Sequence, residues 1–142
     1  MITEAPLQIY KSSAGSGKTY TLTTAYLKLA LESPTAFTRI LAVTFTNKAT
    51  QEMKDRIIKE LKRLKSGVDP NETMHRELLE KWQLSPKELS ERATQVLTTI
   101  LHDFGSFSVS TIDSFFQKVI RAFAREIDLQ AKFDVELDLD GI

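Results

Sequence analysis

The chain has 142 residues, of which 42% are hydrophobic and 27% are charged, a composition typical of a soluble protein with one well-packed domain. Lysine and arginine total 19 and aspartate and glutamate also total 19, so no overall positive field indicates a nucleic-acid partner, and any such binding must be local. Cysteine is absent, which excludes disulfides and cysteine-bound metals. Neither a signal peptide nor a bilayer-length apolar run is found, so we expect a cytoplasmic protein without a membrane partner.

A phosphate-binding loop is predicted near the amino terminus. The short apolar run 7–10 indicates a strand, the run after Thr19 has the apolar period of a helix, and a glycine-rich segment lies between them. The expected nucleotide-binding residues are Ser12, Ser13, Ala14, Gly15, Ser16, Gly17, Lys18, Thr19 and Tyr20. The order strand, loop, helix is the one that a P-loop requires, and the alternative is a flexible turn before an ordinary helix.

Each residue type in this loop suits the phosphates of ATP. Gly15 and Gly17 lack a Cβ, so the backbone can turn tightly and bring its N–H groups close to phosphate oxygens. The helix that follows directs the positive end of its dipole at the same anion. Lys18 is predicted to reach the β- and γ-phosphates, and the Thr19 hydroxyl is predicted to bind Mg²⁺ together with ATP. Lys18 and Thr19 are therefore the predicted catalytic residues, and ATP and Mg²⁺ the predicted cofactors.

The rest of the chain alternates strands and helices around a helical stretch. Apolar runs at 39–45 and 107–112 predict buried strands. A helix over 47–64 is expected after the first, and after the second a helix that begins near Ser114 with Gln117 completing a capping box. The predicted fold is α/β, a parallel sheet flanked by helices with a small helical insertion. The expected divisions are residues 1–64, the insertion 65–106, and residues 107–142.

Periodicity and charge predict which helical positions are buried and which are exposed. In the first helix the apolar period includes Leu22, Tyr26 and Leu29. Expected core positions include Leu78, Leu97, Leu101 and Phe104 in the insertion, and Phe116, Val119, Ile120 and Phe123 in the last helix. Glu52 with Arg56 and Asp55 with Lys59 are expected to form exposed ion pairs. Asp69 and Ser85 are predicted helix caps. His75 and His102, which lack a carboxylate at ligand spacing, are expected to pack or face solvent rather than to bind metal.

The segments after the two later strands carry a family resemblance. Motif Ia of superfamily 1 DNA helicases of the UvrD, Rep and RecB type resembles Thr44-Phe45-Thr46-Asn47-Lys48-Ala49-Thr50, continuing as Glu52-Met53-Lys54-Asp55-Arg56-Ile57. Their motif Ib resembles Val109-Ser110-Thr111-Ile112-Asp113-Ser114-Phe115. The P-loop of that family resembles A-x-x-G-x-G-K-T, which accounts for serine rather than glycine at position 12. The resemblance covers most of residues 7 to 127 and is nearest to the amino-terminal region of the RecB and AddA helicase-nuclease subunits.

This resemblance implies a RecA-like motor with single-stranded DNA along its two later motifs. The implied DNA contacts are Thr44, Phe45, Thr46, Asn47, Ser110, Thr111 and Ser114. The alternative interpretation makes Thr46 and Ser114 helix caps and Phe45 a core residue. Asp113 stands where many relatives have histidine, and because a carboxylate repels phosphate it is left out of the DNA-binding set and interpreted as a cap of its own helix.

The function implied is that of an ATP-dependent DNA helicase, an ATP hydrolase that moves along single-stranded DNA in double-strand-break repair and recombination. Its partners would be single-stranded DNA or DNA ends and a second helicase-nuclease subunit. Two other functions fit a P-loop: a small kinase, which needs an arginine-rich lid, and a noncatalytic nucleotide-binding module.

The acidic residues that complete a P-loop motor are not found after Ile112. ATP hydrolysis needs a Mg²⁺-binding acid at the end of a second apolar strand and an adjacent acid for the attacking water. The acids from Asp134 to Asp140 follow no such strand. We therefore expect an incomplete motor domain, an amino-terminal fragment with negligible ATP hydrolysis of its own. Its uncovered apolar faces are expected to favour self-association.

Overall fold

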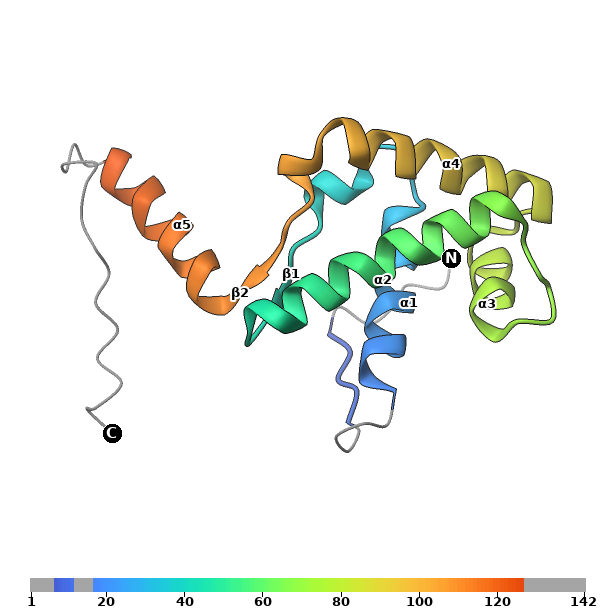
Figure 1. The fold of residues 1–142 in the computed structure, drawn as a ribbon, viewed down its shortest axis with the longest axis horizontal. Helices are drawn as coiled ribbons and strands as arrows, with labels where there is room; N and C mark the ends of the chain where they lie inside the picture. Colours follow the sequence, from blue (N-terminus) through green and yellow to red (C-terminus); the bar gives the residue numbers. More distant parts are fainter. Residues whose placement is uncertain (1–6, 12–16, 127–142) are drawn as a thin grey trace.

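The computed structural model describes residues 7–11 and 17–126, and the fold within them is mostly helical (Figure 1). The elements in chain order are α1 (Lys18–Ala30), η1 (Ala36–Arg39), β1 (Ala42–Thr44), α2 (Asn47–Ser66), α3 (Thr73–Trp82), α4 (Pro86–His102), η2 (Phe104–Ser106), β2 (Val109–Thr111) and α5 (Ile112–Glu126). Figure 1 shows α2 and α4 side by side, α3 at one end of this pair, and α5 projecting from the other end.

The core lies among α1, α2, α3 and α4. Buried apolar side chains recur every three or four residues along α2, at Met53, Ile57, Leu61 and Leu64, and this stripe faces the buried side of α4. The helices of the predicted insertion contribute to the same core as α1 and α2, with Met74 and Leu78 from α3 and Leu89, Ala93, Val96, Leu97 and Ile100 from α4. The packing of α2 on α4 therefore holds the rest of the fold in place.

The buried face of α1 is rotated from the one that the sequence predicted. Leu22 and Leu29 are 54% and 52% exposed, whereas Thr23 and Thr24 are buried beside Leu27. The Thr23 hydroxyl donates to the Thr19 carbonyl at 2.7 Å and the Thr24 hydroxyl to the Tyr20 carbonyl at 2.9 Å. Because these bonds satisfy the hydroxyls within the helix, both threonines can enter the core without leaving a polar group unpaired. The helix that the apolar period predicted is present, but the period at Leu22 and Leu29 does not mark its buried face.

The sheet of the described residues consists of β1 and β2, which pair in parallel. The parallel pairing and the order of strands and helices are consistent with the predicted α/β class. The strand predicted over 7–10 is not formed, and Leu7 and Ile9 are each 74% exposed. The predicted strands 39–45 and 107–112 are shortened to three residues each, and a 3₁₀ turn, η1, occupies residues 36–39. A strand that has a neighbour on one side only forms few ladder bonds, which keeps this sheet small.

The predicted cap at Ser85 is present, and the one at Asp69 is not. Glu88 N–H donates to Ser85 Oγ at 3.2 Å, and Ser85 N–H donates to the Glu88 carboxylate at 2.8 Å, which lowers the pKa of Glu88. Asp69 instead accepts from the Asn71 N–H at 2.9 Å in a turn, and α3 begins after Glu72. At the end of α4, Leu101 and Phe104 are 55% and 48% exposed, so the core prediction is wrong for both.

The last described helix, α5, has an apolar side that no described element covers. Phe116, Ile120 and Phe123 are 56%, 38% and 61% exposed, contrary to the prediction that they form a core face, and Ala124 is the buried residue of this helix. The helix starts earlier than predicted because Thr111, not Ser114, caps it: the Thr111 hydroxyl oxygen accepts from the Ser114 N–H at 3.2 Å. Apolar surface on a projecting helix is typical of an interaction face.

Candidate nucleotide and DNA site

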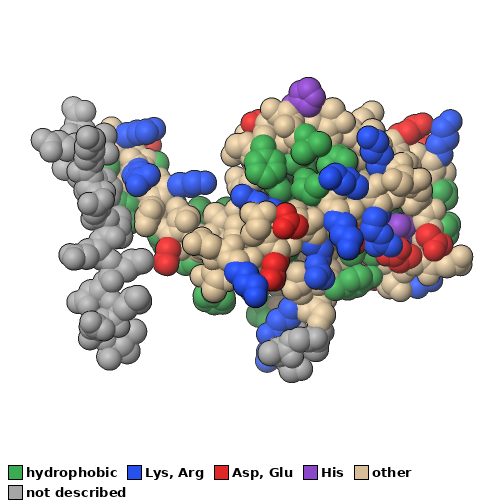
Figure 2. Space-filling view, viewed as in Figure 1, with side chains coloured by type: hydrophobic (Ala, Val, Ile, Leu, Met, Phe, Trp, Pro, Cys, Tyr) green, Lys and Arg blue, Asp and Glu red, His purple; other side chains and the backbone are tan. Residues whose placement is uncertain are grey.

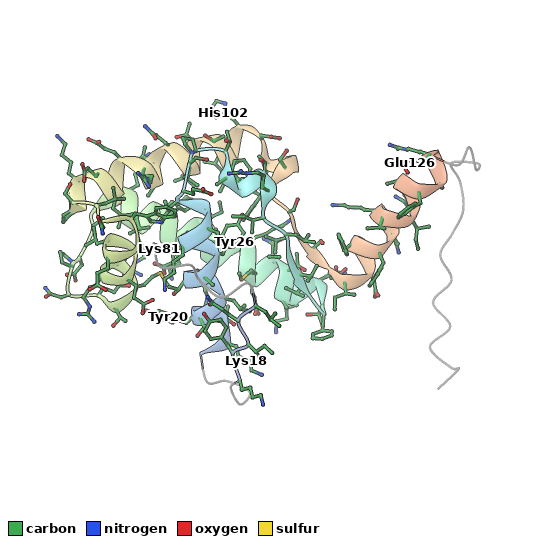
Figure 3. All side chains as sticks on the ribbon, turned by 180° about the vertical axis from the view of Figure 1, so that it is seen from behind. Lys18, Tyr20, Tyr26, Lys81, His102 and Glu126 are labelled. Carbon is green, nitrogen blue, oxygen red and sulfur yellow. The ribbon has the colours of Figure 1, made fainter. Side chains whose placement is uncertain are left out.

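The amino-terminal end of α1 has the features of an anion site. Gly17 precedes the helix with φ 87°, a left-handed conformation that glycine adopts without strain. Glycine has no side chain to cap the N–H groups of the first turn, and this turn contains no acidic residue. Figure 3 shows Lys18 at the free end of α1, where its side chain is exposed. The rest of the predicted loop, residues 12–16, lies outside the described residues.

These features fit a nucleotide phosphate on the part of the loop that the structure describes. Uncapped N–H groups and the positive end of the helix dipole attract the same negative charge, and Lys18 adds a mobile cation beside them. Thr19 lies in the first turn and is half-buried, and Tyr20 after it is 40% exposed. In contrast, the residue before α2 and the residue before α4 each have a side chain that accepts a hydrogen bond from an N–H group of the first turn. The start of α1 therefore differs from the starts of these two helices in the way that phosphate binding requires.

The two motifs that resemble DNA-contact motifs lie side by side. The strand pairing sets Val43 opposite Ser110 and Thr44 opposite Thr111, at the ends of β1 and β2. Helix α2 begins three residues after Thr44, and α5 begins directly after Thr111. Because the strands are parallel, their carboxyl ends meet at one edge, which is the usual ligand edge of an α/β sheet. The fold thus places both motifs at a single site.

The hydroxyl groups at this edge hold the turns in shape. Thr46 Oγ1 accepts from the Ala49 N–H at 3.0 Å and so caps α2. Thr44 Oγ1 lies 2.6 Å from Thr50 Oγ1, and the Thr111 hydroxyl donates to Ser114 Oγ at 2.9 Å. The alternative interpretation is therefore correct that Thr46 is a helix cap, while Ser114 receives a cap rather than providing one. Each of these bonds fixes how a strand leads into the next helix.

Phe45 and Asn47 are accessible members of the site. Phe45 is 88% exposed, which excludes its interpretation as a core residue in the described fold. Asn47 is exposed at the first position of α2. Asp113 is exposed in the first turn of α5, where a negative charge suits the helix dipole, although Thr111 and not Asp113 caps that helix. An exposed aromatic ring beside a helix start offers a stacking surface next to N–H donors.

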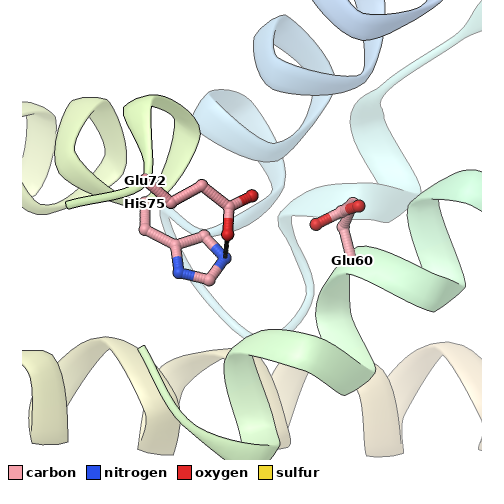
Figure 4. Close-up of side chains that lie close together, drawn as sticks. All are labelled: Glu60, Glu72 and His75. Atoms are coloured by element: carbon pink, nitrogen blue, oxygen red, sulfur yellow. Dashed lines mark ion pairs between the residues drawn. The ribbon is translucent and has the colours of Figure 1, made fainter. Parts of the chain in front are cut away.

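A second cluster, between α2 and α3, has the residue types of a metal site. Glu60, Glu72 and His75 place ligand atoms within 4.8 Å of one another (Figure 4), so the expectation that His75 has no nearby carboxylate is wrong. Arg63 donates to Glu60 at 2.8 Å and to Glu72 at 2.6 Å, and these bonds raise the pKa of its guanidinium. A cation of the protein itself thus already bridges the two carboxylates.

The tautomer of His75 also disfavours a metal at this cluster. His75 is 2% exposed, and its Nδ1 accepts from the Asp69 N–H at 2.9 Å. The proton of the neutral ring therefore lies on Nε2, the nitrogen that faces Glu72 at 3.7 Å. Because a protonated nitrogen cannot bind a metal, we interpret the cluster as a polar joint that ties α3 to α2. The expectation that His75 packs inside the protein agrees with its burial.

The sequence analysis missed the positive charge that α2 exposes. Neither of the expected pairs, Glu52 with Arg56 and Asp55 with Lys59, is among the ion pairs of the described residues. Asp55 accepts instead from Gln51 Nε2 at 2.8 Å. The recurrence of lysine at positions 59, 62 and 65, with few acids among them, is the signal that could have indicated a basic surface.

Comparison with known proteins gives one family. The family model of the UvrD/REP helicase N-terminal domain matches residues 2–140. The AddA-type ATP-dependent helicase/nuclease protein of Lactobacillus johnsonii is 35% identical over 130 residues, which are 92% of this chain and 9% of that protein. The corresponding protein of Bacillus cytotoxicus is 33% identical over 126 residues, covering 87% of this chain and 8% of that protein. No solved structure gives a significant match.

The chain spans about 9% of the length of the first of these relatives. The protein of the same description from Lactococcus lactis subsp. cremoris is more distant, 25% identical over 130 residues. Within the part of the chain that the structure describes, every helix is too short or too polar to cross a membrane.

Proposed function

Because the chain belongs to the family of the UvrD/REP helicase N-terminal domain, we propose that it is the amino-terminal part of an ATP-dependent DNA helicase that moves along single-stranded DNA. The observation that carries this proposal is the pairing of Thr44 with Thr111, which brings two separate motifs to one sheet edge. The uncapped start of α1 supports a nucleotide site in the same domain.

At the nucleotide site, the residues of this chain bind and orient the phosphates. The N–H groups that follow Gly17 donate to phosphate oxygens, and Lys18 neutralises charge that accumulates on them. Thr19 is the residue that would hold Mg²⁺ through its hydroxyl, and the ion would supply charge stabilisation for phosphoryl transfer. Residues 12–16 complete the proposed cradle, and Tyr20 borders it.

At the DNA site, the roles divide between stacking and backbone contact. Phe45 offers its exposed ring to a base, an interaction that every base can make and that therefore suits movement along any sequence. The side chains of Asn47 and Ser110 donate to the phosphate backbone. These donors are kept in position by the hydrogen bonds of Thr44 with Thr50, of Thr46 with the Ala49 N–H, and of Thr111 with Ser114.

The biological setting is proposed from the relatives. AddA-type ATP-dependent helicase/nuclease proteins resemble this chain, and we infer a role in double-strand-break repair and recombination in the cytoplasm, in partnership with a second helicase-nuclease subunit. Since the acids for hydrolysis are not found in this sequence, the isolated 142-residue chain is expected to hydrolyse ATP negligibly. Turnover by this chain that Lys18→Ala abolishes would contradict that expectation.

The kinase alternative finds little support in the helical insertion. A kinase lid needs arginines free to close over the phosphoryl group, and the insertion contains Arg76 and Arg92. Arg92 donates to the Leu31 carbonyl at 3.1 Å and lies over the Trp82 ring at 5.7 Å. This arginine is held in the packing of α4 against its neighbours, which leaves the helicase as the better-supported function.

The test is the ATPase rate of the full-length protein with and without single-stranded DNA. We expect DNA to stimulate the rate severalfold and Lys18→Ala to remove both the basal and the stimulated rates. Lys87→Ala, which removes an exposed lysine at the start of α4, is the matched control and should leave both rates unchanged. An ATPase that ignores single-stranded DNA would refute the proposed function.

A further inference from the structure

A groove lined by lysines runs between α2 and the end of α4. Lys54, Lys59 and Lys62 line it from α2, and Leu101 and Phe104 line it from the other side, around a volume of about 390 Å³. Lys59 and Lys62 also line an adjoining hollow of about 440 Å³ that leads toward Gly67. Figure 2 shows the same arrangement as a row of basic side chains along α2 beside an apolar patch. The groove thus combines positive charge with an apolar wall.

The positive charge in this groove is available to a ligand. Asp55 is the acidic residue that lines it, and this carboxylate already accepts a hydrogen bond from Gln51. Neither Lys59 nor Lys62 takes part in an ion pair among the described residues, whereas the neighbouring Arg63 is neutralised by Glu60 and Glu72. Three lysines and one acid therefore line the groove, and this excess of positive charge complements a polyanion.

The wall of the groove favours a single strand over a duplex. Phe104 is 48% exposed, and the Lys54 ammonium lies 5.4 Å from the centre of its ring. An aromatic surface beside backbone-binding lysines is the arrangement by which proteins hold unpaired nucleotides, whose bases are free to stack. A duplex keeps its bases inside and would leave the apolar wall unused.

The groove lies along the helix that begins at the proposed DNA site. Helix α2 starts at Asn47, and Lys54 is about 10 Å further along its axis at a rise of about 1.5 Å per residue, with Lys62 about 12 Å beyond. Measured along the helix axis, the first lysine of the groove is thus about 10 Å from the start of α2, where the proposed DNA site lies.

We propose that the groove between α2 and α4 continues the path of single-stranded DNA, with Lys54, Lys59 and Lys62 on its phosphates and Phe104 against a base. The assignment to DNA rests on the proposed function. It extends the contact region from Lys54, at the end of the first of these motifs, to Lys59, Lys62 and Phe104, which lie outside both motifs.

The test measures how salt affects binding of the full-length protein to fluorescein-labelled (dT)20, followed by fluorescence anisotropy between 50 and 200 mM salt. Lys59→Ala combined with Lys62→Ala removes two phosphate contacts, so the slope of log affinity against log salt should fall by about 1.4. The control Arg76→Ala with Lys87→Ala removes equal charge from exposed positions that do not line the groove, and its slope should match wild type. Phe104→Leu should weaken binding about fivefold with an unchanged slope.

The outcomes separate this proposal from the proposed function. Equal slopes for the groove variant, the control and wild type would overturn the groove. The proposed function would still stand in that case if Phe45→Ala weakens binding and DNA stimulates the ATPase. Weaker binding of a labelled duplex by the groove variant, with (dT)20 binding unchanged, would overturn the single-strand assignment. Wild-type protein that fails to bind (dT)20 would refute the groove and the proposed function together.

Discussion

Replacing Phe45 by alanine tests whether motif Ia contacts DNA bases. Because the side chain is 88% exposed, the substitution removes almost no packed surface, and the free energy of unfolding should change by less than about 0.5 kcal/mol. If a base stacks on the ring, its loss costs about 1–3 kcal/mol of binding free energy. By the relation between free energy and affinity, this corresponds to a rise of roughly 5- to 150-fold in the Kd for single-stranded DNA.

The assay is anisotropy with labelled (dT)20 on the full-length protein, together with thermal unfolding of each variant. Phe45→Trp keeps a stacking surface and should bind within about twofold of wild type. Phe37→Ala provides the contrast, since Phe37 is fully buried and its truncation should cost about 3–5 kcal/mol of stability. An unchanged Kd for Phe45→Ala with an unchanged Tm would refute the stacking role. A large loss of stability would show instead that the ring is packed in the folded protein.

Three further predictions concern stability and association. Tyr26 is 4% exposed, its hydroxyl has no partner among the described residues, and burial raises its pKa. Tyr26→Phe should therefore raise the free energy of unfolding by about 1 kcal/mol, as measured with a denaturant. A loss of stability would reveal a partner for that hydroxyl. Hydrogen bonds from Ser85 lower the pKa of Glu88, so the ionised carboxylate stabilises the fold above its unfolded pKa of about 4.3, and this stabilisation is lost as pH falls through the lower folded pKa. The Tm difference between wild type and Glu88→Gln should therefore vanish in acid. A Tm difference that stays constant with pH would argue against the cap. The 142-residue chain should self-associate through the exposed apolar side of α5. Light scattering should show a monomer for the variant with both Phe116→Ser and Phe123→Ser. A wild-type chain that is monomeric at all concentrations would rule out self-association.

The sequence predicted local structure best where a signal was contained within a few residues. Ser85 and Glu88 form their capping box because both halves of it lie within one turn. The stripe from Met53 to Leu64 was predictable because a long periodic helix has only one apolar face. The parallel direction of the sheet was also predictable, since strands joined through a helical crossover run parallel, whereas the register that sets Thr44 opposite Thr111 was not predicted.

The errors arise where the pairing or burial of a residue depends on partners that are distant in the sequence, or on which face of its own helix is buried. Leu7 and Ile9 have the pattern of a strand, but a strand forms only beside another strand, and none pairs with them in the described fold. In α1, Thr23 and Thr24 are buried with their hydroxyls bonded to carbonyls of their own helix, while Leu22 and Leu29 are exposed. Periodicity marks a face as apolar without saying what covers it, which is why the side of α5 was predicted as core.

Movement along single-stranded DNA is the central claim, and displacement of streptavidin from the end of a biotinylated single strand measures it most directly. With the full-length protein, we predict that ATP and Mg²⁺ speed up displacement by at least tenfold over spontaneous release. Lys18→Ala, or a nonhydrolysable ATP analogue in place of ATP, should give the spontaneous rate. A displacement rate that is the same with and without ATP would contradict the account.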